Sequence, residues 1–227
     1  MNPEQLTGQT ETHLTHTTIG TKVFQVHHEV VQDLLALKQA ASDAGFNLCI
    51  ASGFRDFQRQ AAIWNSKMRG ERDILNSHSQ PIDPLNLNDA QKVSAILRWS
   101  ALPGASRHHW GTDFDIYDSI SIPEGVTLKL EPWEYLTGHQ QHFYQWLSSH
   151  LHQFGFYFPY KEERGGVAIE PWHISHVKTG NACLSALSID VLRSELHRNP
   201  IQGNNTVLDS LEAIYTQYIT NVNSAEM

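Results

Sequence analysis

The sequence of 227 residues is poor in charge, in cysteine and in long hydrophobic runs. Charged residues make up 18% of it, below the roughly 25% of an ordinary soluble domain, which argues against a charge-dense, disordered chain. Lys and Arg number 16 against 24 Asp and Glu. Because phosphate binding needs a basic face, nucleic acid is excluded as an expected partner. No apolar run approaches the roughly 20 residues of a membrane span, so no membrane partner is expected either.

The two cysteines and the N-terminal segment both point to the cytoplasm. Cys49 and Cys183 lie far apart in the sequence, and two such cysteines are most simply free, buried thiols. Residues 1–20 have no basic start and no apolar stretch, which is unlike a secretory signal. We therefore expect a cytoplasmic protein, or a periplasmic one if a signal peptide has been removed.

Apolar spacing predicts irregularly mixed helices and short strands. Helices are expected over 30–44, from an N-cap at Asp56 through Met68, and after Gly180; further helices are expected over 89–99 and 137–154. Residues 71–86 read as a surface loop. Short strands are predicted over 47–51, 112–117, 156–160 and 167–174. This mixture indicates a single α+β domain with a helical C-terminal tail.

Histidine is abundant, at 14 residues, and two histidines stand beside carboxylates. His108 precedes Asp115 by seven residues, and Glu170 precedes His173 by three. Two imidazoles and one carboxylate suit Zn²⁺, and a catalytic zinc keeps a fourth position for water, whose pKa falls to about 7. Glu170 is placed to take that water's proton and pass it to a leaving amine.

Each element alone has a simpler interpretation. A lone histidine is more often a hydrogen-bonding residue than a ligand, and a lone aspartate at a strand edge is usually solvated. The combination of both elements with a glutamate favours the metal site. We assign no metal to further histidines that lie in tail, helix-face or loop contexts. They are His13, His16, His27, His28, His139, His142, His150, His152 and His197.

Three segments resemble motifs of the M15B metallopeptidases, the VanY-type D-alanyl-D-alanine carboxypeptidases and L,D-carboxypeptidases of peptidoglycan. Residues 106–115 resemble the family pattern Ser-x-His-x-x-Gly-x-Ala-x-Asp. Residues 170–173, Glu-Pro-Trp-His, are similar to its Glu-x-Trp-His element. Ser-Gly-Phe-Arg over 52–55, followed by Gln60, is similar to Ser-Gly-Tyr-Arg…Gln. The motifs keep the family's order and cover about 25–178, which leaves an N-terminal segment, 1–24, and a helical extension, 179–227.

The resemblance implies a fold and a metal site. The fold would be a small central antiparallel sheet flanked by helices, as in Hedgehog and the D-Ala-D-Ala peptidases. One zinc ion would be held by His108, Asp115 and His173, with Glu170 as general base and acid. Asp113 stands where the family pattern has alanine. Because residues two apart on a strand share a face, Asp113 is either a partner that supports a ligand or a competing ligand.

Four further residues receive substrate roles from the resemblance. Arg55 would stabilise the substrate carbonyl or hold the terminal carboxylate; its simpler interpretation is a structural salt bridge. Ser52, Gln60 and Ser106 would hydrogen-bond the substrate, although either serine could instead be a turn residue. His109 is expected to point away from the site on an extended chain, as a supporting or surface residue.

The function implied by the resemblance is removal of a terminal D-alanine from peptidoglycan stem peptides. The expected cytoplasmic location favours L,D-carboxypeptidase activity on recycled tetrapeptides. The alternatives are a D,D-carboxypeptidase or peptidoglycan endopeptidase acting on D-Ala-D-Ala ends, and a non-catalytic zinc-binding interaction module. The expected partner is the peptide substrate; nothing in the sequence decides the oligomeric state, the third stem residue or the need for a sugar.

Overall fold

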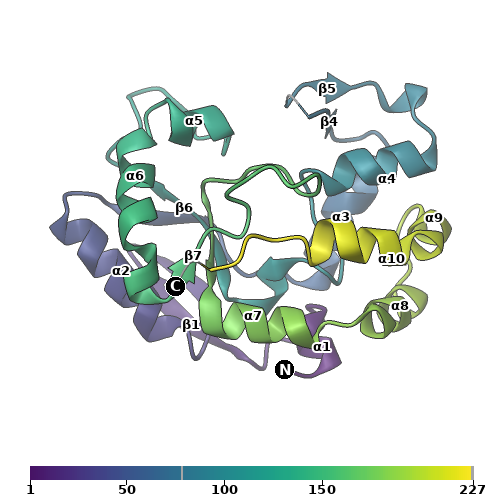
Figure 1. Cartoon of the computed structure of the whole chain (residues 1–227), viewed down its shortest axis with the longest axis horizontal. Coiled ribbons are helices and arrows are strands. Elements are labelled where there is room, and N and C mark those ends of the chain that lie inside the picture. The colour runs from purple at the N-terminus through teal and green to yellow at the C-terminus, as the bar shows by residue number, and fades with distance from the viewer. Residues whose placement is uncertain (78, 226–227) are drawn as a thin grey trace.

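A four-stranded antiparallel sheet carries the functional motifs. The computed structural model describes residues 1–77 and 79–225. Its sheet has the order β3-β6-β8-β7, with bounds Leu48–Ser52, Asp113–Asp118, His173–His176 and Phe156–Tyr157. Helices cover it on both sides (Figure 1). The α+β class with a small antiparallel sheet, expected from the sequence, is confirmed.

The register of the sheet places three motif residues abreast. Asp115 of β6 pairs with Ser52 of β3 on one side and with His173 of β8 on the other. Two residues along, Asp113 pairs with Ser175. The three motifs that are far apart in the sequence therefore meet at one place in the sheet.

Side chains along β6 point alternately to the hydrophobic core on one face of the sheet and to the site on the other face. Phe114 and Ile116 are fully buried on one face of the sheet, where they join Ile174 in a hydrophobic cluster. That cluster is closed by α2 (Val31–Asp43) and α6 (Gln141–His150). Because strand side chains alternate between faces, Asp113 and Asp115 point to the opposite face.

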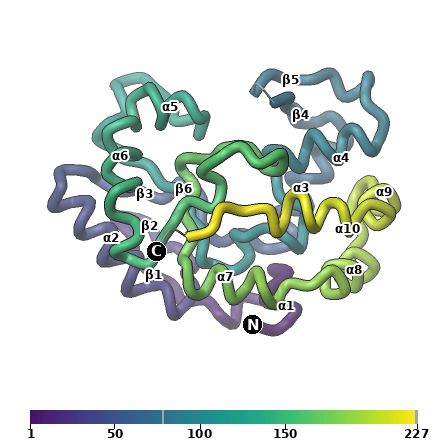
Figure 2. Tube along the Cα trace, viewed as in Figure 1, coloured from purple at the N-terminus to yellow at the C-terminus, as the bar shows by residue number. Residues whose placement is uncertain are grey.

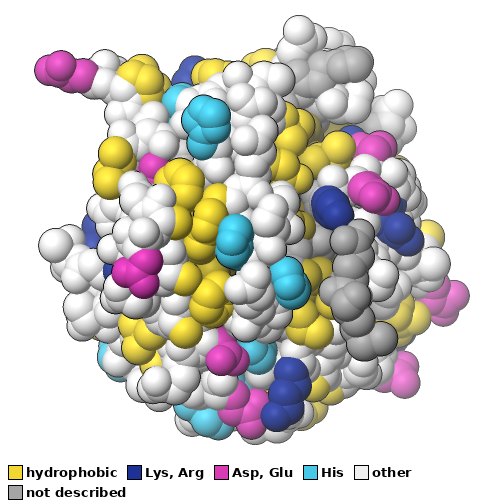
Figure 3. Space-filling view, turned by 60° about the vertical axis from the view of Figure 1, so that its left-hand side comes forward, with side chains coloured by type: hydrophobic (Ala, Val, Ile, Leu, Met, Phe, Trp, Pro, Cys, Tyr) yellow, Lys and Arg dark blue, Asp and Glu magenta, His cyan; other side chains and the backbone are white. Residues whose placement is uncertain are grey.

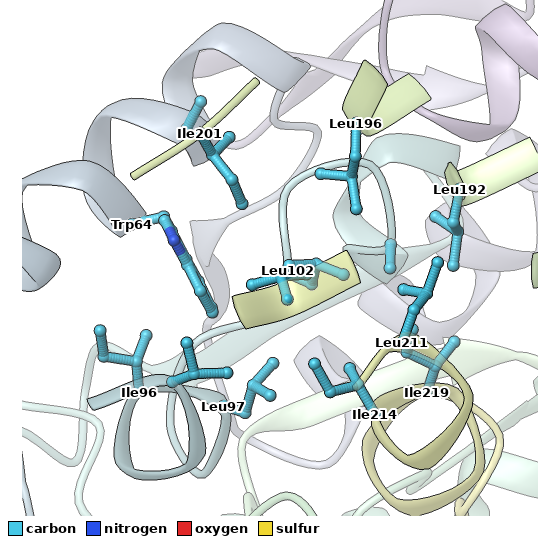
Figure 4. Packing of buried hydrophobic residues seen from close by; sticks show 14 of the residues in the cluster. Trp64, Ile96, Leu97, Leu102, Leu192, Leu196, Ile201, Leu211, Ile214 and Ile219 are labelled. Carbon is cyan, nitrogen blue, oxygen red and sulfur yellow. The ribbon is translucent and has the colours of Figure 1, made fainter. Parts of the chain in front are cut away.

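A second hydrophobic cluster lies on the other side of the molecule. It joins α3 (Phe57–Met68) and α4 (Asp89–Leu97) to the C-terminal elements, whose bounds are Val177–Ala186 for α7, Ile189–Arg198 for α8, Asn204–Asp209 for α9, Leu211–Ile214 for α10 and Tyr215–Ile219 for a terminal π-helix. Figure 4 shows Trp64 of α3 and Leu102 among side chains from these helices. The C-terminal extension therefore completes a core of the domain. Residues 226 and 227, at the end of this extension, lie outside the described residues.

The chain ends are tied into the fold. Trp110 Nε1 donates to the carbonyl of Leu6 in α1 (Pro3–Leu6). Glu195 of α8 is buried and accepts hydrogen bonds from Thr7 and Gln9. In Figure 2 the C-terminal trace returns from α10 toward β7, and Asn223 N donates to Pro159 O there.

The N-terminal segment contains a hairpin that the sequence patterns did not predict. Strands β1 (Leu14–Ile19) and β2 (Lys22–His27) pair in full antiparallel register. Gly20, at the turn between them, has a φ of 65°. The boundary expected between the N-terminal segment, 1–24, and the part of the chain that the motifs cover therefore falls inside β2.

Other predicted elements differ in extent. The strand expected over 167–174 begins only at His173, because Ala168 and Glu170 bond singly to Arg98 and Tyr160 instead of forming a ladder. The strand expected over 156–160 ends at Tyr157. The helix expected over 137–154 is α6 followed by a 3₁₀ turn, Leu151–Phe154. A short helix, α5 (Pro132–Leu136), precedes α6.

The predicted loop over 71–86 has local order. It contains the short pair β4 (Ile74–Leu75) and β5 (Pro81–Ile82) and a 3₁₀ turn, Pro84–Asn86. Its residue 78 lies outside the described residues. No helix within the described part of the chain is long and apolar enough to cross a membrane.

Candidate active site

His108 is delivered by a tight turn rather than by a strand. A 3₁₀ turn, Arg107–Trp110, ends at Gly111, whose φ is 66°. A Cβ at Gly111 would lie 2.4 Å from Leu14 Cδ2 and 2.9 Å from the backbone nitrogen of His27. Glycine is therefore required both by the backbone angle and by the close approach of the hairpin. The turn carries the chain directly into β6.

His108, Asp115 and His173 meet as the sequence predicted. One ligand-type atom from each lies within 4.8 Å of the others, and all three residues are buried. Asp115 Oδ2 is 3.4 Å from His108 Nε2, and Asp115 Oδ1 is 3.3 Å from His173 Nδ1. Burial favours the neutral form of Asp115, but the two imidazoles hold its pKa well below the usual range.

These three residues fit one zinc ion. Two nitrogens and one oxygen are the donors of a catalytic zinc site with a free fourth position. Asp115 Oδ1 is buried and makes no hydrogen bond, so a cation would satisfy a polar atom that is otherwise costly to bury. The expected single-zinc cofactor agrees with this geometry.

Glu170 stands beside the ligand-type cluster. Its Oε2 lies 3.2 Å from His173 Nδ1, and its side chain is 14% exposed. His173 N donates to Glu170 O, and Glu170 N donates to Tyr160 O. These backbone bonds form a turn that fixes the carboxylate and the imidazole relative to each other, with the carboxylate accessible to substrate.

Asp113 supports His173 from the opposite edge of the ring. Asp113 Oδ1 is 3.0 Å from His173 Nε2 and accepts from Arg107 Nε at 2.7 Å, while Thr112 Oγ1 donates to Oδ2. Burial favours the neutral acid, but Arg107 and His173 hold the pKa of Asp113 well below its ordinary value. The sequence left open whether Asp113 supports a ligand or competes as one. The geometry favours the supporting role, as in a carboxylate–histidine–metal arrangement.

The ring of His173 is thus surrounded by acids. Burial alone lowers its pKa, but the hydrogen bond with Asp113 and the nearby carboxylates of Asp115 and Glu170 raise that pKa well above the usual value. The same negative field that holds a proton on the ring attracts a divalent cation.

Arg55 is held by two polar neighbours. Its Nη1 donates to Gln60 Oε1 at 2.6 Å and its Nη2 to Ser52 Oγ at 3.0 Å. Nε is buried without a partner, as is Ser106 Oγ. Burial lowers the pKa of Arg55, opposed by Asp115. No ion pair to Arg55 is found in the described residues, so the geometry does not favour a structural salt bridge, and the guanidinium keeps donor capacity for substrate.

His109 is a supporting residue rather than a surface one, although the chain around it is not extended as expected. It is completely buried rather than at the surface, because the 3₁₀ turn directs it inward. Gly104 N donates to His109 Nε2, which assigns the proton to Nδ1, and Nδ1 lies 2.6 Å from Arg55 O. Burial lowers the pKa of His109 to about 3. The neutral ring therefore pins the backbone of Arg55.

The site opens into a cavity of about 290 Å³. Arg55, Ser106 and Glu170 line it together with the three ligand-type residues, whereas Ser52 and Gln60 do not. Ser52 and Gln60 hydrogen-bond Arg55 and so position its guanidinium, and their direct contact with substrate stays a prediction.

The sequence reasoning missed several residues of the cavity wall. Tyr160 packs edge-on against His173, with ring centroids 5.1 Å apart, and burial raises its pKa to about 12. Lys67 and Trp99 line the far wall, and Tyr218 and Ile219 come from the C-terminal extension. No spacing rule marks these residues, because only the tertiary fold brings them to the cavity.

The other histidines form no second metal cluster within the described residues. On the face shown in Figure 3, histidine side chains are dispersed rather than gathered. His139 does have an acidic neighbour in space, since its Nε2 is 3.2 Å from Glu134 Oε1. His176, which the sequence reasoning passed over, pairs with Asp33 at 3.0 Å and caps α7.

An antiparallel sheet that presents a buried His-Asp-His cluster, an adjoining glutamate and a buried arginine has the arrangement of a catalytic metal site. The family model for VanY, D-alanyl-D-alanine carboxypeptidase, matches residues 23–179, more than half of the chain. The chain belongs to this family, which confirms the resemblance noted in the sequence. It is an enzyme of the metallocarboxypeptidase class, which hydrolyses peptide bonds.

Individual relatives agree in sequence and fold. An uncharacterized protein of Haemophilus influenzae is 47% identical over 104 residues, which cover 45% of this chain and 70% of that protein. The structure of VanYB in complex with D-alanine-D-alanine has a TM-score of 0.52 at 22% identity, covering 86% of this chain and 87% of VanYB. The LdcB LD-carboxypeptidase has a TM-score of 0.54 at 20% identity, covering 78% and 75%. The two structures share the fold with this chain.

Proposed function

We propose that this chain is a zinc-dependent L,D-carboxypeptidase that removes the terminal D-alanine from peptidoglycan stem tetrapeptides. The observation that carries the proposal is the convergence of His108, Asp115, His173, Glu170 and Arg55 on one cavity. Family membership gives the reaction class, and the site gives a division of roles.

The chain's own residues would hold the metal and orient it. His108, Asp115 and His173 would bind one zinc ion, and Asp113 would fix the ring of His173. A bound zinc ion supplies a Lewis acid and lowers the pKa of water. A non-catalytic zinc module would have no use for the accessible carboxylate of Glu170 beside such a site.

Glu170 and Arg55 would act on the substrate. Glu170 would take a proton from the attacking water at a carboxylate oxygen and return it to the amine nitrogen of D-alanine as the peptide C–N bond breaks. Arg55 would donate to a substrate oxygen, either the carbonyl that gains negative charge or the terminal carboxylate. Ser106, whose buried hydroxyl makes no hydrogen bond, would add a second polar contact.

The extent of the cavity leaves room for the substrate of an L,D-enzyme. An L,D-enzyme must accommodate the long third-residue side chain of the stem peptide before the cleaved bond, whereas a D,D-enzyme accommodates the methyl group of D-alanine. The cavity of about 290 Å³ reaches from the ligand-type cluster to Trp99 and Lys67. This is more room than a methyl group needs.

The test compares tetrapeptide and pentapeptide substrates with the zinc-loaded chain, by mass spectrometry of the products. We expect release of D-alanine from the tetrapeptide. Release from the pentapeptide alone would establish the D,D alternative, and cleavage within intact sacculi would establish an endopeptidase. The cytoplasmic location stays a prediction, which cell fractionation tests.

A further inference from the structure

Lys67 contributes a positive charge to the active-site cavity. It lies near the C-terminal end of α3, is partly buried, and lines the cavity together with the ligand-type residues. Its Nζ donates to Ser100 Oγ at 2.9 Å. No ion pair joins it to a carboxylate in the part of the chain that the structure describes.

The position of Lys67 along α3 separates it from Arg55. Gln60, which binds Arg55, lies seven residues before Lys67 on the same helix. Seven residues are two helical turns, so the two side chains leave the same face of α3 roughly 10 Å apart along the axis. Lys67 and Arg55 therefore mark two separate cationic points in one cavity.

The wall around Lys67 is apolar. Trp99 and Leu75 line the cavity beside it, with Trp99 fixed by a hydrogen bond from Nε1 to Asn76 O at 3.0 Å. Leu97 and Leu102 continue the apolar wall. Such a wall accommodates methylene groups, and the ammonium at its end accommodates an anion.

The surroundings leave the ammonium short of compensating charge. Burial lowers the pKa of Lys67, the charge of Arg72 lowers it further, and Asp73 opposes these effects. Among the described residues the ammonium donates to one acceptor, the hydroxyl of Ser100. A partly buried cation in this setting gains strongly from a carboxylate, because charge-assisted hydrogen bonds are about twice as strong as neutral ones.

We propose that Lys67 and Ser100 form a second carboxylate-binding subsite, which selects stem peptides whose third residue ends in a carboxylate, as diaminopimelate does, over those with lysine. This inference rests on the proposed function, because it names the substrate of the same site. A lysine side chain would bring a second ammonium against Lys67. The other source of such a carboxylate is the α-carboxylate of the γ-linked D-glutamate at the second stem position.

The experiment measures kcat/KM of the zinc-loaded enzyme on four tetrapeptides, with diaminopimelate or lysine at the third position and free or amidated D-glutamate at the second. The variants are Lys67→Met, Lys67→Arg and the control Lys22→Met, since Lys22 is exposed on the hairpin. Circular dichroism and thermal melting check that each variant is folded.

The wild type is expected to prefer the diaminopimelate peptide, and Lys67→Met to lose about 10-fold to 100-fold in kcat/KM on that peptide only. Lys67→Arg should retain most of the preference, and Lys22→Met all of it. If the loss instead follows the free D-glutamate, that carboxylate is the one bound. An equal loss on all four peptides, or no loss, overturns the subsite.

Binding separates this inference from the proposed function. Calorimetry measures the affinity of the tripeptide product for Glu170→Gln, with and without Lys67→Met. If no tetrapeptide is hydrolysed but the tripeptide binds with a Lys67-dependent preference for the carboxylate, the proposed function fails and the subsite stands. If hydrolysis occurs and both variants bind the two tripeptides equally, the subsite fails and the proposed function stands.

Discussion

The buried ion pair between Arg107 and Asp113 allows stability and metal affinity to be separated. Arg107 is 4% exposed, Asp113 is fully buried, and Arg107 Nε lies 2.7 Å from Asp113 Oδ1. Replacing Asp113→Asn keeps the size of the side chain but leaves the charge of Arg107 buried without a counter-ion. Such a change costs about 3–5 kcal/mol, which lowers Tm by roughly 6–20 °C in a chain of this size.

Removing both charges should have a different result. In Arg107→Met with Asp113→Ala, no buried charge remains unpaired, and a methionine can pack on Trp110, over whose ring the guanidinium now lies at 4.9 Å. Replacing a whole buried pair is often close to neutral. We therefore expect the double variant to recover most of the free energy of unfolding that Asp113→Asn loses, as measured by urea denaturation of the metal-free protein.

Zinc affinity should not recover. Both variants remove the carboxylate that fixes His173 Nε2, and loss of such a supporting partner typically weakens metal binding about 10-fold to 100-fold. Competition with a chromophoric chelator measures this. A double variant that binds zinc as tightly as the wild type would refute the assignment of Asp113 as the orienting partner, and a fully stable Asp113→Asn would refute the electrostatic argument.

Three further predictions concern catalysis, acid stability and the turn before β6. Glu170→Gln should lower kcat about 10²-fold to 10⁴-fold with unchanged zinc content by metal analysis; undiminished turnover would contradict its role as base. Burial lowers the pKa of His27 to about 4 and of His109 to about 3, so the native chain binds fewer protons than the unfolded chain below pH 6.5. The free energy of unfolding of the metal-free protein should thus fall as pH falls from 6.5 toward 4, by up to about 1.4 kcal/mol per pH unit for each histidine; a flat profile in urea titrations would contradict this. Gly111→Ala should cost about 2 kcal/mol or more, since it is strained and meets Leu14 at 2.4 Å, and an unchanged urea midpoint would count against it.

The helices and the metal cluster could be predicted because their causes are local. Asp56 caps α3 as expected, with its side chain accepting from Arg59 N. The motif residues His108, Asp115 and His173 come together because neighbouring strands carry two of them in register. Motif spacing and strand alternation are properties of short segments, so the sequence displays them.

Other features depend on contacts that no local pattern records. The hairpin formed by β1 and β2 shows alternation and a glycine turn, but it carries many polar residues and is completed by packing against Gly111. Asp113 could be placed on the same strand face as Asp115, but its role was decided by Arg107 and by the far nitrogen of His173. The position of Lys67 in the cavity required the whole path of α3.

The C-terminal extension, 179–227, helps to form the wall of the active-site cavity. The family match ends at residue 179, yet Tyr218 and Ile219 line the active-site cavity. Gln217 Nε2 donates to Gly165 O at 2.7 Å, and Ala168 N donates to Arg98 O at 2.9 Å. The loop that leads to Glu170 is therefore held between the extension and α4. Because the metal and proton chemistry depends on the shared motifs while the cavity wall depends on this extension, substrate preference is the property in which this chain should differ most from its relatives.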